Sequence, residues 1–463
     1  MREQMELFEG RWRSLCEVFL PVVHSGQPWR FSRTATDSDP TQGWKLHVSA
    51  TILTACDVLD IVGPILLRWN ALYKAPESIV ELRRINTGLY HGYSQVGKFI
   101  TVYLERVEDT LAVAAELDKA THGMPCPRVP FDRSLHDGSC VSYRYGAFRS
   151  ARVRDDDAPG DISMIRTPDG LLIPDERTRD AAVPSWERDP FLQLSSSFRS
   201  ENSRVTPLKT TYRAYEAISQ RGKGGVYKAI NLRFAPALPC IIKEGRMNGE
   251  TDWDGTDGFH RILNEKRILE RLASYGVPVA QVVDYFTVDR SNFLVLEYIS
   301  GTLLHSIVTG KRKLPISKAL LYGAGLAEVV GDIHNAGVAW RDCKPLNIIV
   351  DESGRLRPLD FEGACLAHEA PVEPYGTFGY APPEWLRETG SRYLDLEAQD
   401  LYALGATLHH IFSGQPPESD VKLQPIGSLR HGIPPRVRKM VSSLTDAIPG
   451  ARPAAPMVAN AFH

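Results

Sequence analysis

A strand–turn–strand pattern in the second half of the chain constrains the fold more than any other feature. Residues 340–364 read WRDCKPLNIIVDESGRLRPLDFEGA. The runs IIV and LRPL are typical of β-strands, and ESGR between them is typical of a turn. The pattern predicts a β-hairpin, with Asp342 and Asn347 on the loop before it and Asp360 directly after it. These three polar side chains are therefore expected to lie close together.

Their chemistry fits the transfer of a phosphoryl group from a nucleoside triphosphate. Such a transfer needs a carboxylate that orients the attacking hydroxyl, oxygen ligands for Mg²⁺ and a cation on the phosphates. Asp342 is the candidate base, and Asn347 and Asp360 are the candidate Mg²⁺ ligands. Lys344 lies on the same loop and is expected to neutralise the γ-phosphate.

This segment resembles the catalytic signature of protein kinases, H-R-D-x-x-x-x-N followed by D-F-G. Two positions depart from it. Trp340 stands where His is usual, and Glu362 stands where the Gly of D-F-G is usual. Neither change removes a catalytic group, and Glu362 is expected to stiffen its loop.

Further motifs follow in the order that protein kinases have. Lys243 in CIIK is expected to bind the α- and β-phosphates, and Glu265 in RILNEKRILERL to pair with it, with Glu270 as the second choice. The resemblance implies that LVLEYISG is the hinge, which meets adenine near Glu297 and Tyr298. ATP, or another nucleoside triphosphate, and Mg²⁺ are the implied cofactors.

The glycine-rich loop is the weakest of these motifs. Backbone N–H groups approach phosphates closely where side chains are absent. In SQRGKGGVYKA, Gly224 and Val226 match the final G-x-V and are expected to bind the nucleotide. Ser219 and Arg221 occupy the two earlier glycine positions.

The run GTFGYAPPEW resembles the end of the activation segment of protein kinases, with Glu384 in the place of the Glu of A-P-E. Asp400 in DLYALG is expected to brace the catalytic loop, and Arg452 to pair with Glu384. Thr377 is the only aliphatic hydroxyl between Asp360 and Glu384, which favours constitutive activity. The alternative is a pseudokinase, which keeps the kinase fold for binding without catalysis, although the Lys, the base and the metal ligands are all present.

A second set of residues lies in the first half of the chain. In an extended GWKLHVSA, Lys45 and His47 share a face, because strand side chains alternate. An imidazole among cations suits a β-elimination from phosphoserine or phosphothreonine, which needs a base, an acid and a grip on the leaving phosphate. Four more cations occur in the motifs LYKAP, GKFITVY, FDR and YRYGAF: Lys74, Lys98, Arg133 and Arg144. Taken singly, such residues are more often solvated charges, and a lone His is often a core hydrogen-bonder.

These motifs resemble, in order, the N-terminal lyase domain of class III and class IV lanthipeptide synthetases, which is similar to phosphothreonine lyases with a K-x-H motif. The resemblance implies that His47 is the general acid and Lys74 the base. It also implies that Lys45, Lys98, Arg133 and Arg144 grip the phosphate. Other charged or aromatic residues are expected to be structural: the Arg83–Arg84 pair a solvated face, and His409–His410 helix packing.

The domain organisation follows from these motifs. We expect an α+β protein with a lyase-like domain over residues 1–150, including a helix around 52–72 and strands near 44–50 and 99–104. Residues 151–205 are rich in Asp, Arg, Pro and Ser and predict a loop-dominated connector with at most a hairpin, in which LLIP is a possible strand. A kinase N-lobe and hinge would occupy 206–301, and a C-lobe 302–463.

Composition excludes several classes of protein. The chain is 43% hydrophobic and 24% charged, with a formal charge of −2, which is unlike a disordered chain or a general nucleic-acid binder. It has no run of about 18 apolar residues and no basic, apolar signal sequence. Its seven scattered cysteines are expected to be reduced thiols of a cytoplasmic protein without a structural metal or a membrane partner.

The combined prediction is a bifunctional dehydratase of a ribosomal precursor peptide that carries a leader. The kinase half would phosphorylate Ser or Thr, and the N-terminal half would eliminate the phosphate. No cyclase is expected after Arg452, so the chain is read as a truncated form or as a natural two-domain form that works with a separate cyclase. A Ser/Thr kinase with a regulatory N-terminal part, and a silent scaffold, remain the rivals.

Overall fold

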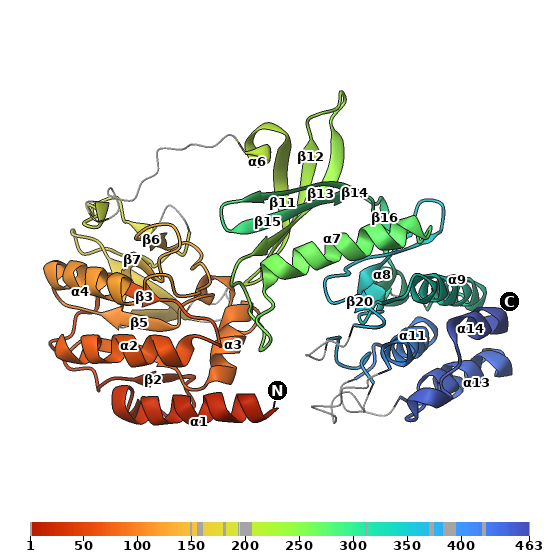
Figure 1. Cartoon of the computed structure of the whole chain (residues 1–463), viewed down its shortest axis with the longest axis horizontal. Coiled ribbons are helices and arrows are strands. Elements are labelled where there is room, and N and C mark those ends of the chain that lie inside the picture. The colour runs from red at the N-terminus through yellow and green to blue at the C-terminus, as the bar shows by residue number, and fades with distance from the viewer. Residues whose placement is uncertain are drawn as a thin grey trace.

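Figure 1 shows an N-terminal body, red to yellow, beside a two-lobed body, green to blue. This computed structural model describes residues 2–148, 151–154, 161–178, 182–192, 194, 206–310, 313–369, 375–382, 395–418 and 423–462. The main hydrophobic core of the N-terminal body is separate from the core of the two-lobed body. Among the described helices, none combines the length and the apolar character that crossing a membrane requires.

The N-terminal body is built on a seven-stranded antiparallel sheet, of order β1-β2-β4-β5-β3-β7-β6. The strands are β1 (Val22–Val23), β2 (Trp29–Phe31), β3 (Gln42–Val48), β4 (Leu72–Pro76), β5 (Ile100–Tyr103), β6 (Arg133–Ser134) and β7 (Val141–Ala147). Its helices are α1 (Arg2–Phe19), α2 (Ala55–Arg68), α3 (Ile79–Thr87), η1 (Tyr93–Gln95) and α4 (Val107–Ala120). The predicted helix and both predicted strands are confirmed.

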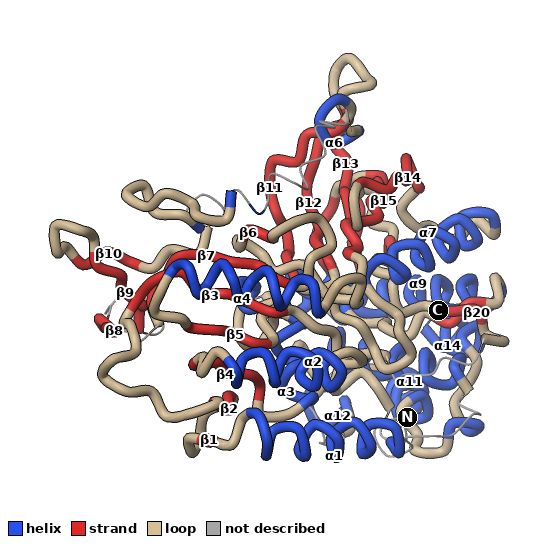
Figure 2. The backbone as a smooth tube through the Cα atoms, turned by 60° about the vertical axis from the view of Figure 1, so that its left-hand side comes forward, coloured by secondary structure: helices blue, strands red, loops and turns tan. Residues whose placement is uncertain are grey.

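Strand β3 is buried on both faces, and the two faces differ in character. Trp44, Leu46 and Val48 enter the apolar core, to which α2 and α4 contribute Val62 and Leu117. Figure 2 shows these helices against the sheet. The alternate residues of β3 point away from this core. The face opposite the helices is therefore free to carry polar chemistry.

The segment after β7 contains more structure than its composition predicts. It forms a three-stranded sheet of β8 (Ala151–Arg154), β9 (Asp161–Arg166) and β10 (Leu172–Pro174). The prediction of at most a hairpin was therefore wrong, although LLIP is a strand. Phe191 stacks on Tyr143 of β7, with ring centroids 3.9 Å apart, and lies in the N-terminal core. The described part of this segment is packed on the N-terminal body.

The first lobe of the second body is a five-stranded antiparallel sheet with one long helix. Its strands run β11-β12-β13-β15-β14: β11 (Tyr212–Arg221), β12 (Gly224–Asn231), β13 (Leu238–Arg246), β14 (Val282–Val288) and β15 (Ser291–Glu297). Helix α6 (Pro207–Thr210) precedes them, and α7 (Gly258–Ser274) follows β13. Asp257 caps α7 by accepting the His260 N–H at 3.0 Å. Ile262, Leu269 and Leu272 of α7 are buried in the core.

The second lobe is mainly helical, as predicted. Its helices are α8 (Leu304–Val308), α9 (Ile316–Asn335), η3 (Pro345–Asn347), α11 (Leu396–Ser413), α12 (Ile426–Leu429), α13 (Pro435–Leu444), η4 (Pro449–Ala451) and α14 (Ala455–Phe462). Its short strands are β16 (Gly301–Leu303), β17 (Val338–Ala339), β18 (Ile348–Asp351), β19 (Leu356–Pro358) and β20 (Cys365–Leu366). β18 and β19 form the predicted hairpin. His409 and His410 lie within α11 and are buried, as expected for helix packing.

The loop between β13 and α7 joins the two bodies. Its Trp253 is 3% exposed, contacts Phe8 of α1 edge-on and belongs to the N-terminal core. Asp252 pairs with Arg83 of α3 at 2.6 Å and also contacts Arg261 of α7. Arg84 is exposed, as predicted for a solvated face, and Arg83 keeps 40% of its side chain exposed but also bridges to the second body, which was not predicted.

Candidate active sites

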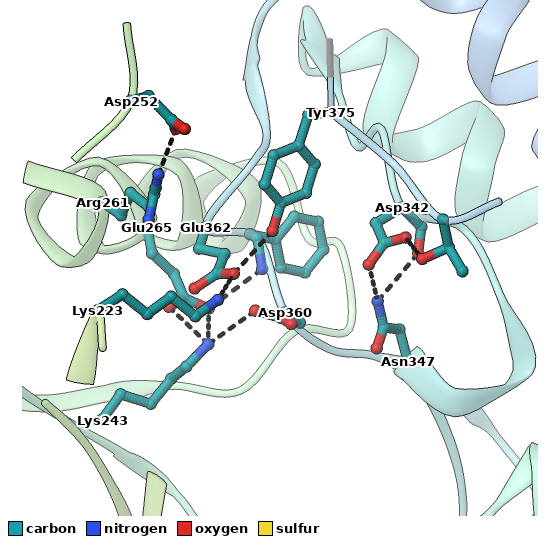
Figure 3. Close-up of polar contacts among 12 residues, drawn as sticks. Lys223, Lys243, Asp252, Arg261, Glu265, Asp342, Asn347, Asp360, Glu362 and Tyr375 are labelled. Atoms are coloured by element: carbon teal, nitrogen blue, oxygen red, sulfur yellow. Dashed lines mark hydrogen bonds and ion pairs between the residues drawn. The ribbon is translucent and has the colours of Figure 1, made fainter. Parts of the chain in front are cut away.

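The first site lies between the two lobes and is organised by Lys243. Strand β13 presents Lys243, whose Nζ lies 2.7 Å from Glu265 of α7 and 2.9 Å from Asp360 (Figure 3). Burial opposes the positive charge, but the carboxylates of Asp360, Glu265 and Glu362 raise the pKa of Lys243 above its ordinary value. Glu270, the second candidate, instead pairs with Lys266 on the surface of the helix.

The catalytic loop gathers polar groups around Asp342. Its carboxylate accepts hydrogen bonds from Asn347 Nδ2 at 2.8 Å and from Lys344 Nζ and Thr377 Oγ1, each at 2.7 Å. All but Thr377 come from one short loop, as the sequence spacing predicts. These three hydrogen bonds fix the orientation of the Asp342 carboxylate.

Asp400 of α11 binds the backbone of this loop. Its carboxylate accepts the backbone N–H groups of Trp340 and Arg341, each at 2.7 Å. Arg341 has a left-handed backbone, with φ 68°, a conformation that persists when its surroundings hold it. The predicted brace thus has a direct structural counterpart. Arg452 donates to the Ala398 carbonyl at 2.9 Å, while its predicted partner Glu384 lies outside the described residues.

The two departures from the kinase signature both have structural partners. The Trp340 ring stacks on Phe361 with centroids 5.5 Å apart, and both side chains are buried. Trp340 therefore fills core volume where His is usual. Glu362 accepts hydrogen bonds from Tyr375 Oη at 2.7 Å and from Lys223 of the β11–β12 turn. Glu362 therefore ties its loop to two other segments.

A cavity of about 510 Å³ opens between these groups. Residues from both lobes line it, including Gly224, Val226, Lys243, Asp342, Lys344, Asn347 and Asp360. Glu297 lies at the end of β15, where its carboxylate accepts from Arg357 at 3.1 Å, and Tyr298 is 38% exposed. Neither is among the residues that line this cavity, so their contact with adenine stays a prediction.

The donor set at the cavity suits Mg²⁺. Asn347 uses its Nδ2 on Asp342, which leaves its amide oxygen for a metal ion. Asp360 contacts Lys243 through Oδ1, which leaves Oδ2 available. Oxygen ligands from two side chains, completed by phosphate oxygens and water, are the set that Mg²⁺ prefers.

The second site lies on the polar face of the N-terminal sheet. Lys45 pairs in register with Arg144 of β7, and His47 with Thr101 of β5, which also faces Lys74 of β4. Residues directly opposite each other in antiparallel strands point to the same face. The sheet order therefore brings Lys45, His47, Lys74 and Arg144 to one surface.

Asp132 orients the histidine of this cluster. Its Oδ2 lies 2.5 Å from His47 Nδ1, and its Oδ1 lies 3.2 Å from Lys98 Nζ. Burial opposes ionisation, but Lys98 and His47 hold the pKa of Asp132 below its ordinary value. An ionised Asp132 only accepts, so Nδ1 of His47 donates to it and Nε2 is left for another partner.

Burial changes the basicity of the cations. It lowers the pKa of Lys45 to about 7 and those of Lys74 and Lys98 to about 8, with neighbouring positive charges acting in the same direction. Burial also lowers the pKa of His47 to about 3. Lys74 Nζ lies 4.3 Å from the centre of the Trp29 ring. A lysine with such a pKa can release its proton near neutral pH and act as a base.

Three residues of this site were not predicted from the sequence: Asp132, and two residues that lie in the presumed connector. Asp175 lies 2.7 Å from Arg144 and 3.8 Å from Lys45. Arg177 is near enough to lower the pKa of Lys74 by its charge. The only local signal in the sequence was that Asp175 follows the LLIP run directly and that Arg177 lies two residues further on.

Arg133 does not join the cluster, contrary to the prediction. It pairs in register with Tyr143, the neighbour of Arg144 along β7, so it points to the opposite face of the sheet. There it contacts Asp189 at 2.6 Å and is partly exposed. Strand pairing, rather than its place in the motif, decides where this cation points.

Comparison with known families divides the chain in the same way as its fold. The family described as RamC, N-terminal domain, matches residues 22–203, and the protein kinase domain family matches residues 212–444. The second match covers half of the chain, and the chain belongs to the protein kinase family. The predicted order, an N-terminal domain of the lanthipeptide synthetase type followed by a kinase, is confirmed.

Individual relatives agree with this division. A protein named probable SapB synthase from Streptomyces coelicolor is 32% identical over 376 residues, which cover 78% of this chain and 39% of that protein. A probable serine/threonine-protein kinase of Clostridium perfringens is 29% identical over 254 residues, 52% of this chain and 35% of that kinase. The chain spans less than half the length of each of these relatives.

Proposed function

We propose that this protein is a lanthipeptide dehydratase that phosphorylates Ser or Thr of a precursor peptide and then eliminates the phosphate. The observation that carries the proposal is the presence of two polar sites in one chain. One holds Lys243, Asp342 and Asp360 around a cavity, and the other holds buried cations around His47. Similarity to a SapB synthase supports the reading of both as parts of one pathway.

In the kinase site, Asp342 orients the substrate hydroxyl and accepts its proton. The hydroxyl oxygen forms a bond to the γ-phosphorus as the bond to the leaving diphosphate breaks. Lys243 holds the nucleotide phosphates, and Lys344 neutralises charge on the transferred group. Mg²⁺, held by Asn347 and Asp360, would offset the negative charge of the phosphates.

In the second site, the Lys74 amine removes the Cα proton of the phosphorylated residue. The electron pair forms the Cα–Cβ double bond, and the Cβ–O bond breaks, releasing phosphate. His47 supplies a proton to the leaving phosphate, while Lys45, Lys98 and Arg144 bind it. The low pKa of His47 fits this role only with substrate bound, because a phosphate dianion beside the imidazole raises its pKa.

The substrate of the proposed reaction is a ribosomally made peptide with a leader segment, and ring formation would fall to a cyclase. Holding both sites in one chain raises the effective concentration of the phosphorylated intermediate at the second site. ATP or another nucleoside triphosphate and Mg²⁺ are the proposed cofactors, in line with the protein kinase family match.

Mass spectrometry of a precursor peptide incubated with the protein, ATP and Mg²⁺ tests this proposal. We expect each modified residue to lose the mass of one water. Lys74→Ala or His47→Ala should instead accumulate peptide that has gained phosphate, and Asp342→Asn should leave it unmodified. A full dehydration rate for Lys74→Ala would refute its assignment as the base.

A Ser/Thr kinase with a regulatory N-terminal body is the second candidate, supported by the serine/threonine kinases among the relatives. It predicts that the wild-type protein stops at the phosphopeptide. A scaffold without catalysis predicts no turnover of ATP at all. The same mass measurement therefore separates the three possibilities.

A further inference from the structure

The turn between β11 and β12 brings a lysine into the kinase cavity. Lys223 lies between Gly222 and Gly224, and its amine contacts the carboxylate of Glu362 (Figure 3). Lys223 lines the same cavity as Lys243, Asp342 and Asp360. The side chain is 21% exposed, so it borders open space as well as its partner. No step proposed above uses this cation.

The backbone at this turn is already engaged. Gly222 N–H donates to the Thr87 carbonyl of the N-terminal body at 3.1 Å, and the Lys223 carbonyl accepts from Arg246 N–H at 2.8 Å. A Cβ on Gly222 would lie 1.7 Å from the Asn86 carbonyl oxygen. The tip of the turn therefore rests on the end of α3, and its Gly222 N–H points at protein rather than at a nucleotide.

Glu362 provides an anionic site for the lysine when no phosphate is there. Its carboxylate accepts hydrogen bonds from Lys223 Nζ and, at 2.7 Å, from Tyr375 Oη. Its side chain is 7% exposed. Two unusual residues, a lysine in the glycine-rich turn and a glutamate after Asp360–Phe361, thus form one ion pair.

We propose that Lys223 is a nucleotide-binding residue whose amine leaves Glu362 to bind the terminal phosphate of the nucleoside triphosphate. The inference rests on the proposed kinase function. A side-chain cation would then supply the contact that backbone N–H groups supply in glycine-rich loops. Charge-assisted hydrogen bonds from an ammonium to phosphate oxygens are strong enough to replace such backbone contacts.

Binding measurements with two nucleotides separate this role from a structural one. In the presence of Mg²⁺, the full-length protein is titrated with a β,γ-imido analogue of ATP and with ADP. Lys223→Met should weaken binding of the triphosphate analogue by about tenfold and leave ADP binding unchanged, because only the triphosphate reaches Lys223. Lys223→Arg should restore most of the triphosphate affinity.

Lys228→Met is the matched control. Lys228 lies on β12, pairs with Glu216 on the surface and is not among the residues that line the cavity. This variant removes the same charge from the same strand pair and should bind both nucleotides as the wild type does.

Two results would overturn the inference. An equal loss of affinity for both nucleotides in Lys223→Met would mean that Lys223 only shapes the turn. An unchanged affinity for the triphosphate analogue would mean that Lys223 does not contact its terminal phosphate. Failure of the broader functional proposal has a different signature, since a wild-type protein that binds nucleotide but leaves the peptide unmodified would refute that proposal alone.

Discussion

At the scale of the residue, Lys74 illustrates how burial changes chemistry. An exposed lysine is protonated at neutral pH, but burial and the nearby charges of Arg177 and Lys98 lower the pKa of Lys74 to about 8. The same surroundings lower the pKa values of Lys45 to about 7 and Lys98 to about 8. The same environment therefore favours the neutral form of the proposed base and lowers the positive charge of the cations proposed to bind the phosphate.

The proposed elimination should show a bell-shaped pH profile. As pH rises towards 8, Lys74 loses its proton and the rate increases. As pH rises beyond 7 to 8, Lys45 and Lys98 lose their charges and phosphate binding weakens. For a synthetic phosphopeptide, kcat/KM is expected to peak between these values, because it reports groups of the free enzyme. A flat profile from pH 6 to pH 9 would contradict this assignment.

We propose that Asp132 positions the imidazole of His47. Asp132→Asn removes the charge that fixes the proton on His47 Nδ1, and we expect elimination to slow by about 100-fold or more. Phosphorylation by the kinase site should continue, so phosphopeptide accumulates in a mass spectrum. Asp189→Asn, which alters a carboxylate on the opposite face beside Arg133, is the control and should eliminate phosphate faster than Asp132→Asn.

At the scale of the element, strands and loops decide which residues can act together. Strand alternation puts Lys45 and His47 on one face, and the order β4-β5-β3-β7 adds Lys74 and Arg144 to it. In the second body, α11 supplies Asp400 beneath the catalytic loop, and Trp340 packs the same loop against Phe361. The loop is therefore held by a buried carboxylate and by an aromatic stack.

Trp340→Ala should destabilise the second body without removing a catalytic group. The Trp340 ring is 1% exposed, and its loss leaves a cavity beside Phe361. We expect the free energy of unfolding of the second body to fall by about 3–5 kcal/mol. A denaturant titration that follows the unfolding of this body measures the change. Phe378→Ala is the control, because Phe378 is 66% exposed and its removal should cost less than about 0.5 kcal/mol. Equal effects of the two changes would contradict this account.

At the scale of the whole molecule, one segment links the two sites. Thr87, at the end of α3, binds the Gly222 N–H of the second body. Further along the segment, the centre of the Tyr93 ring lies 5.3 Å from Arg246 Cζ of the second body. Lys98, a few residues later, belongs to the cation cluster. The N-terminal body therefore supports the nucleotide-side turn of the kinase.

Gly222→Ala tests this support, since the three atoms nearest to the added Cβ all belong to the N-terminal body, the nearest being the Asn86 carbonyl oxygen. The turn must shift, and we expect kcat/KM for phosphorylation to fall by about 10-fold to 100-fold. Elimination from a synthetic phosphopeptide should keep its wild-type rate, which also shows that the N-terminal body is folded. Gly10→Ala is the control, because a Cβ there has nothing within 4 Å. Unchanged phosphorylation in Gly222→Ala would mean that the turn adjusts freely.

Side chains that are close neighbours in the chain could be predicted from the sequence to lie together. Asp342, Lys344 and Asn347 share one short loop, and their spacing alone brings them together. The orientation of Arg133 could not be predicted in this way, because the register of β6 with β7 turns its side chain away from the cluster. The partner of Arg83 could not be predicted either, because Asp252 lies on a loop of the other body.

Residue types and short spacings were enough to predict the α+β class, the order of the two bodies and most of the side chains that can carry chemistry. The partners of the buried charges became evident only in the folded chain. Asp132, Asp175 and the Lys223–Glu362 pair come from segments far apart in the chain. Burial of such charges depends on partners that only the folded chain brings within a few ångströms, so no local pattern specifies them.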